Sequence, residues 1–106
     1  MLYICHMNIT EISKVLANST RVSILKWLKD PESNFPPHKD IDHFNDGVCV
    51  GYIQEKAGLS QSTISTYLTS MQNAELVIPT RHGKWTYYKR NEAIISAYIE
   101  ALATEL

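Results

Sequence analysis

The sequence feature that most constrains the fold is a glycine and a serine set between two stretches whose apolar residues have helical spacing. Gly58 is placed for a left-handed helix C-cap, and Ser60 for the N-cap of the next helix. In that next helix Ile64 and Leu68 fall on one face. Two helices joined by so short a turn are typical of a helix-turn-helix, which we place at residues 50–73.

The flanking segments predict a mainly α-helical protein with one small β-hairpin and about five helices. A helix near the N-terminus and another at about 20–29 precede the motif. Two β-rich runs separated by His82 and Gly83 follow it and predict a tight hairpin, a wing at 76–90. The last helix, 91–106, has a face too apolar for an isolated helix, so we expect it to pack on another helix.

Length and composition indicate one ordinary globular domain. The chain has 106 residues, of which 44% are hydrophobic and 20% charged, so we treat 1–106 as a single domain. No stretch resembles a transmembrane span or a signal peptide, which predicts a cytoplasmic protein without a membrane partner. Cys5 and Cys49 are too few for a disulfide framework, so they are expected to be free thiols.

Residues 30–46 lack periodicity and are rich in proline, aspartate and histidine. They predict a loop, and one that is long for so small a domain. Long loops in compact domains are often functional, although an inserted, solvated loop is the plainer interpretation. The same alternatives apply to a possible hard-metal or mixed-metal cluster of its side chains. That candidate cluster comprises His38, Asp40, Asp42, His43 and Asp46.

The second helix of the motif carries hydroxyl and amide side chains where a surface helix usually carries charge. These residues are weak helix formers, so stability alone does not account for their number. A helix in the DNA major groove needs a face without acidic groups and with side chains short enough to approach base edges. The alternative is that these Ser and Thr residues merely cap and decorate a surface helix. The residues predicted to read DNA are Gln61, Ser62, Thr63, Ser65 and Thr66.

The predicted wing is basic although the chain has a net charge of only −1. No acidic residue lies between Leu76 and Arg90, whereas aspartates gather in the 30–46 loop. The aromatic residues Trp85 and Tyr87 are expected to pack the hairpin rather than stack on bases. Three side chains at the tip are placed to contact phosphate or a minor groove: Arg81, His82 and Lys84.

With these features together, the sequence resembles the ArsR/SmtB family of winged helix-turn-helix regulators. Three successive signatures occur in the family's order: "LANSTRVSILKWL", "VGYIQEKAGLSQSTISTYLTSMQNAELV" and "RHGKWTYYKRNE". The resemblance implies a homodimer formed through the first and last helices, which represses transcription from a pseudopalindromic operator until an inducer, often a metal ion, binds. Glu75 departs from it, because the family usually has glycine there; a left-handed backbone would cost Glu about 1 kcal/mol.

The resemblance weakens at the metal-sensing motif that many members carry as "ELCVCDL". The matching run here is "GVCVGYI": Cys49 keeps the first thiol, but Gly51 replaces the second and Tyr52 replaces the acid. The last helix likewise lacks the paired Asp/His and His/Glu residues of the zinc site that some members hold there. A standard metal site of either kind is therefore not expected.

The thiols leave three interpretations of the inducer open. In some members an N-terminal cysteine reaches the cysteine-bearing helix of the other protomer, and Cys5 with Cys49 would repeat that arrangement. Adding His6 or His43 would give a sulfur and nitrogen shell suited to zinc or another soft metal. Oxidation or reactive sulfur could instead link the two thiols. The plainest interpretation makes Cys49 a small buried hydrophobe.

Other function classes are less well supported by the sequence. No nucleophile elbow, phosphate loop or zinc-hydrolase motif is present, so we do not expect an enzyme. A winged-helix module that binds protein instead of DNA is the alternative. In that case Arg81 and Lys84 would be dispensable, and binding would depend little on salt.

Overall fold

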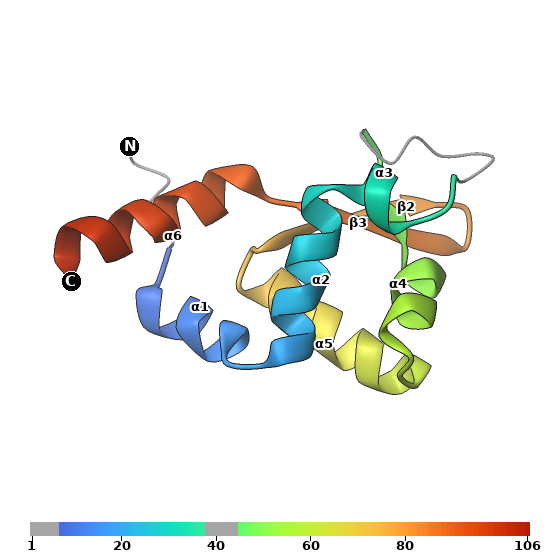
Figure 1. Cartoon of the computed structure of the whole chain (residues 1–106), viewed down its shortest axis with the longest axis horizontal. Helices are drawn as coiled ribbons and strands as arrows, with labels where there is room; N and C mark the ends of the chain where they lie inside the picture. The colour runs from blue at the N-terminus through green and yellow to red at the C-terminus, as the bar shows by residue number, and fades with distance from the viewer. Residues whose placement is uncertain (1–6, 38–44) are drawn as a thin grey trace.

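The computed structural model describes residues 7–37 and 45–106, and these ranges contain six helices and a three-stranded antiparallel sheet (Figure 1). The mainly α-helical winged helix-turn-helix is therefore confirmed, with one more helix than the expected five or so. In chain order the elements are α1 (Ile9–Leu16), α2 (Ser19–Lys29), α3 (Pro31–Asn34), β1 (Val48–Cys49), α4 (Val50–Ala57), α5 (Gln61–Asn73), β2 (Val77–His82), β3 (Trp85–Arg90) and α6 (Glu92–Glu105).

Four helices, α1, α2, α5 and α6, begin at a polar side chain that accepts a hydrogen bond from the third backbone N–H beyond it. The capping residues are Asn8, Asn18, Ser60 and Asn91. Such caps satisfy one of the N–H groups that a helix start leaves unpaired. Gly58 ends α4 in the left-handed region with φ of 68°, as predicted, so α4 and α5 form the helix-turn-helix.

The additional helix, α3, lies at the start of the expected 30–46 loop. Proline at its first position already has helical φ and needs no N–H partner there. The Asn34 amide donates a hydrogen bond to the Trp27 carbonyl at 3.4 Å, and Phe35 is buried edge-on against the Trp27 ring, with centroids 6.5 Å apart. Packing on the end of α2 therefore orders this segment, and the prediction of loop from residue 30 is wrong there.

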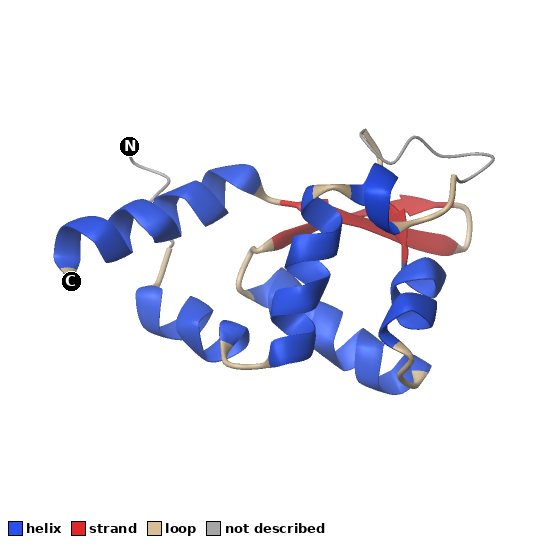
Figure 2. Ribbon diagram, viewed as in Figure 1, coloured by secondary structure: helices blue, strands red, loops and turns tan. Residues whose placement is uncertain are grey.

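The sheet has the strand order β1-β3-β2, with β2 and β3 forming the predicted wing (Figure 2). His82 pairs with Trp85, so the two turn residues are Gly83 and Lys84, one position later than expected. Gly83 has φ of 60°, and Lys84 is not among the positive-φ residues. A positive φ at only the first turn position is typical of a type II′ hairpin.

The short strand β1, which the sequence did not predict, joins the chain before α4 to the wing. Val48 and Cys49 pair with Tyr88 and Tyr87 of β3. Gly47, just before the strand, has φ of 92°, and a Cβ there would lie 2.4 Å from the Tyr88 carbonyl oxygen. Only glycine fits so close to the β3 backbone.

The last helix runs away from the sheet with α1 beside it, and the molecule measures 43 × 25 × 24 Å (Figure 1). The Ser13 hydroxyl lies 2.8 Å from the Tyr98 hydroxyl and links the two helices. The expected packing of this helix on another helix is therefore found with α1. Ile99 nevertheless remains 60% exposed. Within the described ranges, no helix is long and apolar enough to cross a membrane.

Candidate nucleic-acid interface

Helix α5 has one apolar face and one polar face, and the apolar face fixes its orientation. Ile64, Leu68 and Met71 are fully buried in the core. The opposite face therefore points to solvent. Of the five residues predicted to read DNA, Thr63 is half-buried and four are exposed: Gln61, Ser62, Ser65 and Thr66.

Three of these five residues already take part in hydrogen bonds within the helix and its cap. The Ser60 hydroxyl accepts a hydrogen bond from the Thr63 N–H at 3.2 Å and donates to Thr63 Oγ1 at 2.9 Å. It also lies 3.2 Å from the Ser62 hydroxyl. Thr66 Oγ1 donates to the Ser62 carbonyl at 2.9 Å. Thr63 and Ser62 thus belong partly to the helix cap, as the alternative interpretation of the hydroxyl cluster proposed.

Gln61 and Ser65 differ from their neighbours. Both are exposed, and their side chains have no hydrogen-bond partner within residues 7–37 and 45–106. Gln61 occupies the first position of α5 and Ser65 lies about one turn further along. These are the two predicted readers whose donors and acceptors are entirely available to a ligand.

The three predicted tip residues lie together where the hairpin turns, and all three are exposed. Arg81 Nε donates to the Gly83 carbonyl at 3.0 Å, which holds the guanidinium against the turn. His82 Nε2 lies 3.5 Å from Asp46 Oδ1. Lys84 places its ammonium 5.6 Å from the centroid of the Trp85 ring. The tip thus presents cationic groups with one carboxylate nearby.

The two aromatic residues expected to pack the hairpin behave differently. Tyr87 is 2% exposed, which confirms its prediction. Trp85 is 50% exposed, so it is covered only in part and the choice between packing and base contact stays open. Trp85 begins β3 next to the turn, two residues from Tyr87 on the same face. Alternation along the strand gives the face of a residue but not how deeply it is buried.

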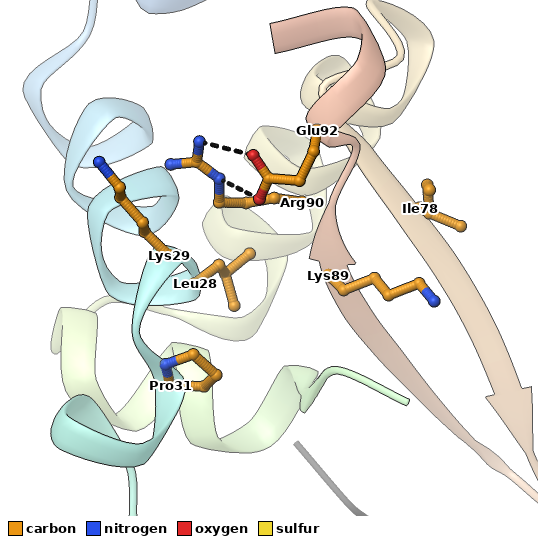
Figure 3. Close-up of a pocket in the computed structure, with 7 residues that line it drawn as sticks. All are labelled: Leu28, Lys29, Pro31, Ile78, Lys89, Arg90 and Glu92. Carbon is orange, nitrogen blue, oxygen red and sulfur yellow. Dashed lines mark hydrogen bonds and ion pairs between the residues drawn. The ribbon is translucent and has the colours of Figure 1, made fainter. Parts of the chain in front are cut away.

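Two further cations of the wing, Lys89 and Arg90, form contacts within the protein. Arg90 forms a two-pronged ion pair with Glu92 at 2.9 and 3.0 Å (Figure 3). It also donates to the Leu25 carbonyl at 3.4 Å. Lys89 donates to the Asn45 carbonyl at 3.1 Å. Both residues line a pocket of about 410 Å³ at the base of the wing. Its other lining residues are Leu28, Lys29, Pro31, Ile78 and Glu92.

The thiol candidates are only partly within the described chain. Cys49 is buried, at 7% exposure, in β1, and it directly precedes α4. A Cβ at Gly51, where the family motif has its second cysteine, would lie 3.8 Å from the Cys49 sulfur. The candidate partners Cys5, His6 and His43 lie outside the described residues, so their pairing with Cys49 stays a prediction.

The loop cluster is likewise mostly outside the structure's description, which omits His38, Asp40, Asp42 and His43. Its remaining member, Asp46, lies against His82 at the wing. Among residues 7–37 and 45–106, no three His, Cys, Asp or Glu side chains are grouped so that they could hold a metal ion.

Comparison with known proteins identifies the family. The chain is 46% identical over 96 residues to the uncharacterized HTH-type transcriptional regulator YbzH of Bacillus subtilis, covering 91% of this chain and 96% of that protein. Together with the three signatures and the fold, this match decides the assignment. The chain belongs to the ArsR/SmtB family. This ArsR/SmtB protein is thus a DNA-binding transcriptional regulator and not an enzyme.

More distant relatives agree with the assignment. A putative arsenical resistance operon repressor, ArsR2 of Halobacterium salinarum, is 28% identical over 82 residues, which cover 77% of this chain and 58% of that protein. No protein-family model matches the chain.

Solved structures show the same fold. HlyU from Vibrio cholerae has a TM-score of 0.60 at 19% identity, over 92% of this chain and 91% of that one. NolR from Sinorhizobium fredii has a TM-score of 0.58 at 24% identity, over 89% and 79%.

Proposed function

We propose that this ArsR/SmtB regulator is a cytoplasmic repressor that binds its operator through α5 and the wing tip. The observation that carries the proposal is the exposed face of α5, a helix without a single charged residue. No carboxylate there repels phosphate, and the short side chains allow the helix to approach base edges. Arg81 and Lys84 at the wing tip supply cations for the DNA backbone.

The proposed active form is a homodimer through α1 and α6. Ile99 is 60% exposed on α6, and Leu106 at the end of the chain is 91% exposed. Exposed apolar groups on a helix that already packs on α1 support a further contact there. A two-fold dimer would present two α5 helices, as a pseudopalindromic operator requires.

For the inducer, we propose chemistry at the thiols: oxidation or reactive sulfur linking Cys49 to Cys5, or a soft metal such as zinc held by both with His6 or His43. The support is the position of Cys49, which packs in β1 and leads directly into α4, the first helix of the motif. Because Cys49 is buried, at 7% exposure, we expect a bond to its sulfur to displace the start of α4. That displacement would pass through the Gly58 turn to α5.

The deciding experiment is fluorescence anisotropy on a labelled duplex from upstream of the protein's own gene, at one fixed salt concentration. The protein is tested with its thiols reduced, then oxidised, with random duplex as competitor and Cys49→Ser as the control for thiol chemistry. Tight reduced binding that oxidation abolishes, except in Cys49→Ser, supports operator binding and the thiol switch. If oxidation does not change the DNA affinity, the inducer is limited to a metal or another ligand.

Absence of binding in both states would contradict the repressor proposal. It would favour the alternative function, a winged-helix module that binds protein. Under that alternative, replacing Arg81 or Lys84 with alanine would leave partner binding unchanged.

A further inference from the structure

A large aromatic side chain, Trp85, lies next to the turn of the wing and is only half covered. Trp85 is 50% exposed, and its one ring contact within the described ranges is with the Lys84 ammonium, 5.6 Å from the ring centroid. An aromatic side chain of this size normally buries most of its surface. Half of the indole is therefore available for contact with another molecule.

The position of Trp85 on the hairpin explains why its side chain is exposed. Alternate residues of β3 share one face of the sheet, so Trp85 and Tyr87 lie on the same face. Tyr87 on that face is 2% exposed, whereas Trp85, one step closer to the turn, is 50% exposed. The hairpin thus projects past the body of the protein between these two residues, and the indole lies on the projecting part.

The groups around the indole indicate what it contacts. Lys84 in the turn is an exposed cation, and His82 pairs directly with Trp85 across the hairpin. Arg81, two residues before the turn, is a second exposed cation on the opposite face of the hairpin. Asp46 places a carboxylate oxygen 3.5 Å from His82 Nε2. An apolar ring beside an exposed cation fits a polyanion with apolar recesses, and a duplex minor groove has both.

We propose that Trp85 is a DNA contact, an indole that enters the minor groove beside the major-groove site of α5. The inference rests on the proposed DNA-binding function and adds to it an apolar anchor at the wing tip. The indole N–H can only donate a hydrogen bond, and the floor of the minor groove presents acceptors at every base pair. Narrow A·T-rich grooves also attract Arg and Lys side chains, so such DNA flanking the core site is the preferred partner.

The affinity test compares variants on one labelled duplex from upstream of the protein's gene, at several salt concentrations. We expect Trp85→Ala to weaken binding roughly tenfold, as for loss of one base–aromatic contact. Its salt slope should stay unchanged, because no charge is lost, whereas Arg81→Ala should reduce the slope. Trp85→Phe should retain most of the affinity. Ile78→Ala is the matched control, since Ile78 is exposed on the same hairpin face further from the turn.

A second measurement reads the contact directly. Trp27 and Trp85 are the two tryptophans of the chain, so Trp27→Phe leaves Trp85 as the sole indole emitter. Adding duplex should change its emission and protect it from acrylamide quenching. If wild-type protein binds the duplex but Trp85→Ala binds equally well and the emission is unchanged, the inference is overturned and the repressor proposal stands. If wild-type protein binds no duplex, both are overturned.

Discussion

Glu75 follows α5 in a backbone conformation that L-residues rarely adopt, with φ of 63°. Two hydrogen bonds hold it there: the Glu75 N–H donates to the Gln72 carbonyl at 2.9 Å, and the Leu76 N–H donates to the Met71 carbonyl at 2.9 Å. This pair of bonds, with Leu76 and Met71 both buried, is a Schellman motif. The turn is therefore the glycine-type turn expected of the family, formed with Glu in place of glycine.

Replacing this residue should stabilise the protein. Glu75→Gly removes the left-handed strain and should raise the free energy of unfolding by about 1 kcal/mol, or about 4–8 °C in Tm. Urea and thermal unfolding measure it. Glu75→Ala is the matched control, because it removes the same charge but keeps a Cβ in the strained conformation. Equal stabilisation by both variants would mean that charge, not strain, is responsible.

Tyr88 on β3 should make stability fall in alkaline solution. Burial raises the pKa of its phenol above the ordinary value of about 10. Well below pH 10 the Tyr88 phenol is neutral in both the folded and the unfolded state. As pH rises through 10 the unfolded chain ionises first, so the free energy of unfolding falls until the folded-state pKa is passed. Tyr88→Phe should reduce the loss between pH 9 and 11 in urea unfolding; an identical pH profile would contradict this.

At the scale of the element, α5 separates residues that hold the helix from residues free to read bases. Because the side chains of Gln61 and Ser65 are unoccupied within the described chain, Gln61→Ala with Ser65→Ala should erode operator preference about tenfold or more and change random-duplex binding little. Arg81→Ala should weaken binding to both duplexes alike. Competition anisotropy measures the ratio.

Controls for this prediction lie on the same helix. Thr69 is exposed but lies nearer the C-terminal end, so Thr69→Ala should leave the preference unchanged. Thr63→Ala should also lower stability, because it removes the Oγ1 that accepts a hydrogen bond from the Ser60 hydroxyl at the helix cap. Equal loss of operator and random binding in the double variant would remove Gln61 and Ser65 from base reading.

At the scale of the whole molecule, the proposed dimer makes a testable demand on α6. Ile99→Glu places a charge on the exposed apolar part of this helix and should shift a dimer to monomer, with operator affinity falling at least tenfold. Analytical ultracentrifugation measures the mass. Ala93→Glu, at an exposed position at the other end of the helix, is the control. A dimer unaffected by Ile99→Glu would place the interface elsewhere.

How much the sequence predicts depends on how local the cause is. The helix-turn-helix, its caps at Gly58 and Ser60, and the wing follow from spacing and capping within a few residues, and all are found. Strand β1 exists because the chain at Gly47 fits closely against β3, and α3 because Phe35 packs on Trp27. Such contacts join residues that are not neighbours in the sequence, so no local sequence pattern predicts them.

The same reasoning applies to the candidate site. The sequence places Arg81 and Arg90 on one basic hairpin, but only the structure separates an exposed cation from one paired with Glu92. It also separates the free Ser65 from Thr63, which is bonded to the cap. Exposure of Trp85 depends on where the covering of the sheet ends, and this too is a property of the tertiary structure.

The hydrogen bond from Thr66 to the Ser62 carbonyl has a consequence for the operator sequence itself. A hydroxyl has one proton, and the Thr66 hydroxyl uses it in the hydrogen bond to the Ser62 carbonyl. Toward DNA the Thr66 oxygen can therefore only accept hydrogen bonds. In the major groove only the exocyclic amines of adenine and cytosine can donate a hydrogen bond to this oxygen, because guanine O6 and thymine O4 are themselves acceptors. We expect the base facing Thr66 to be adenine or cytosine, a bias visible in a selection from randomised duplexes.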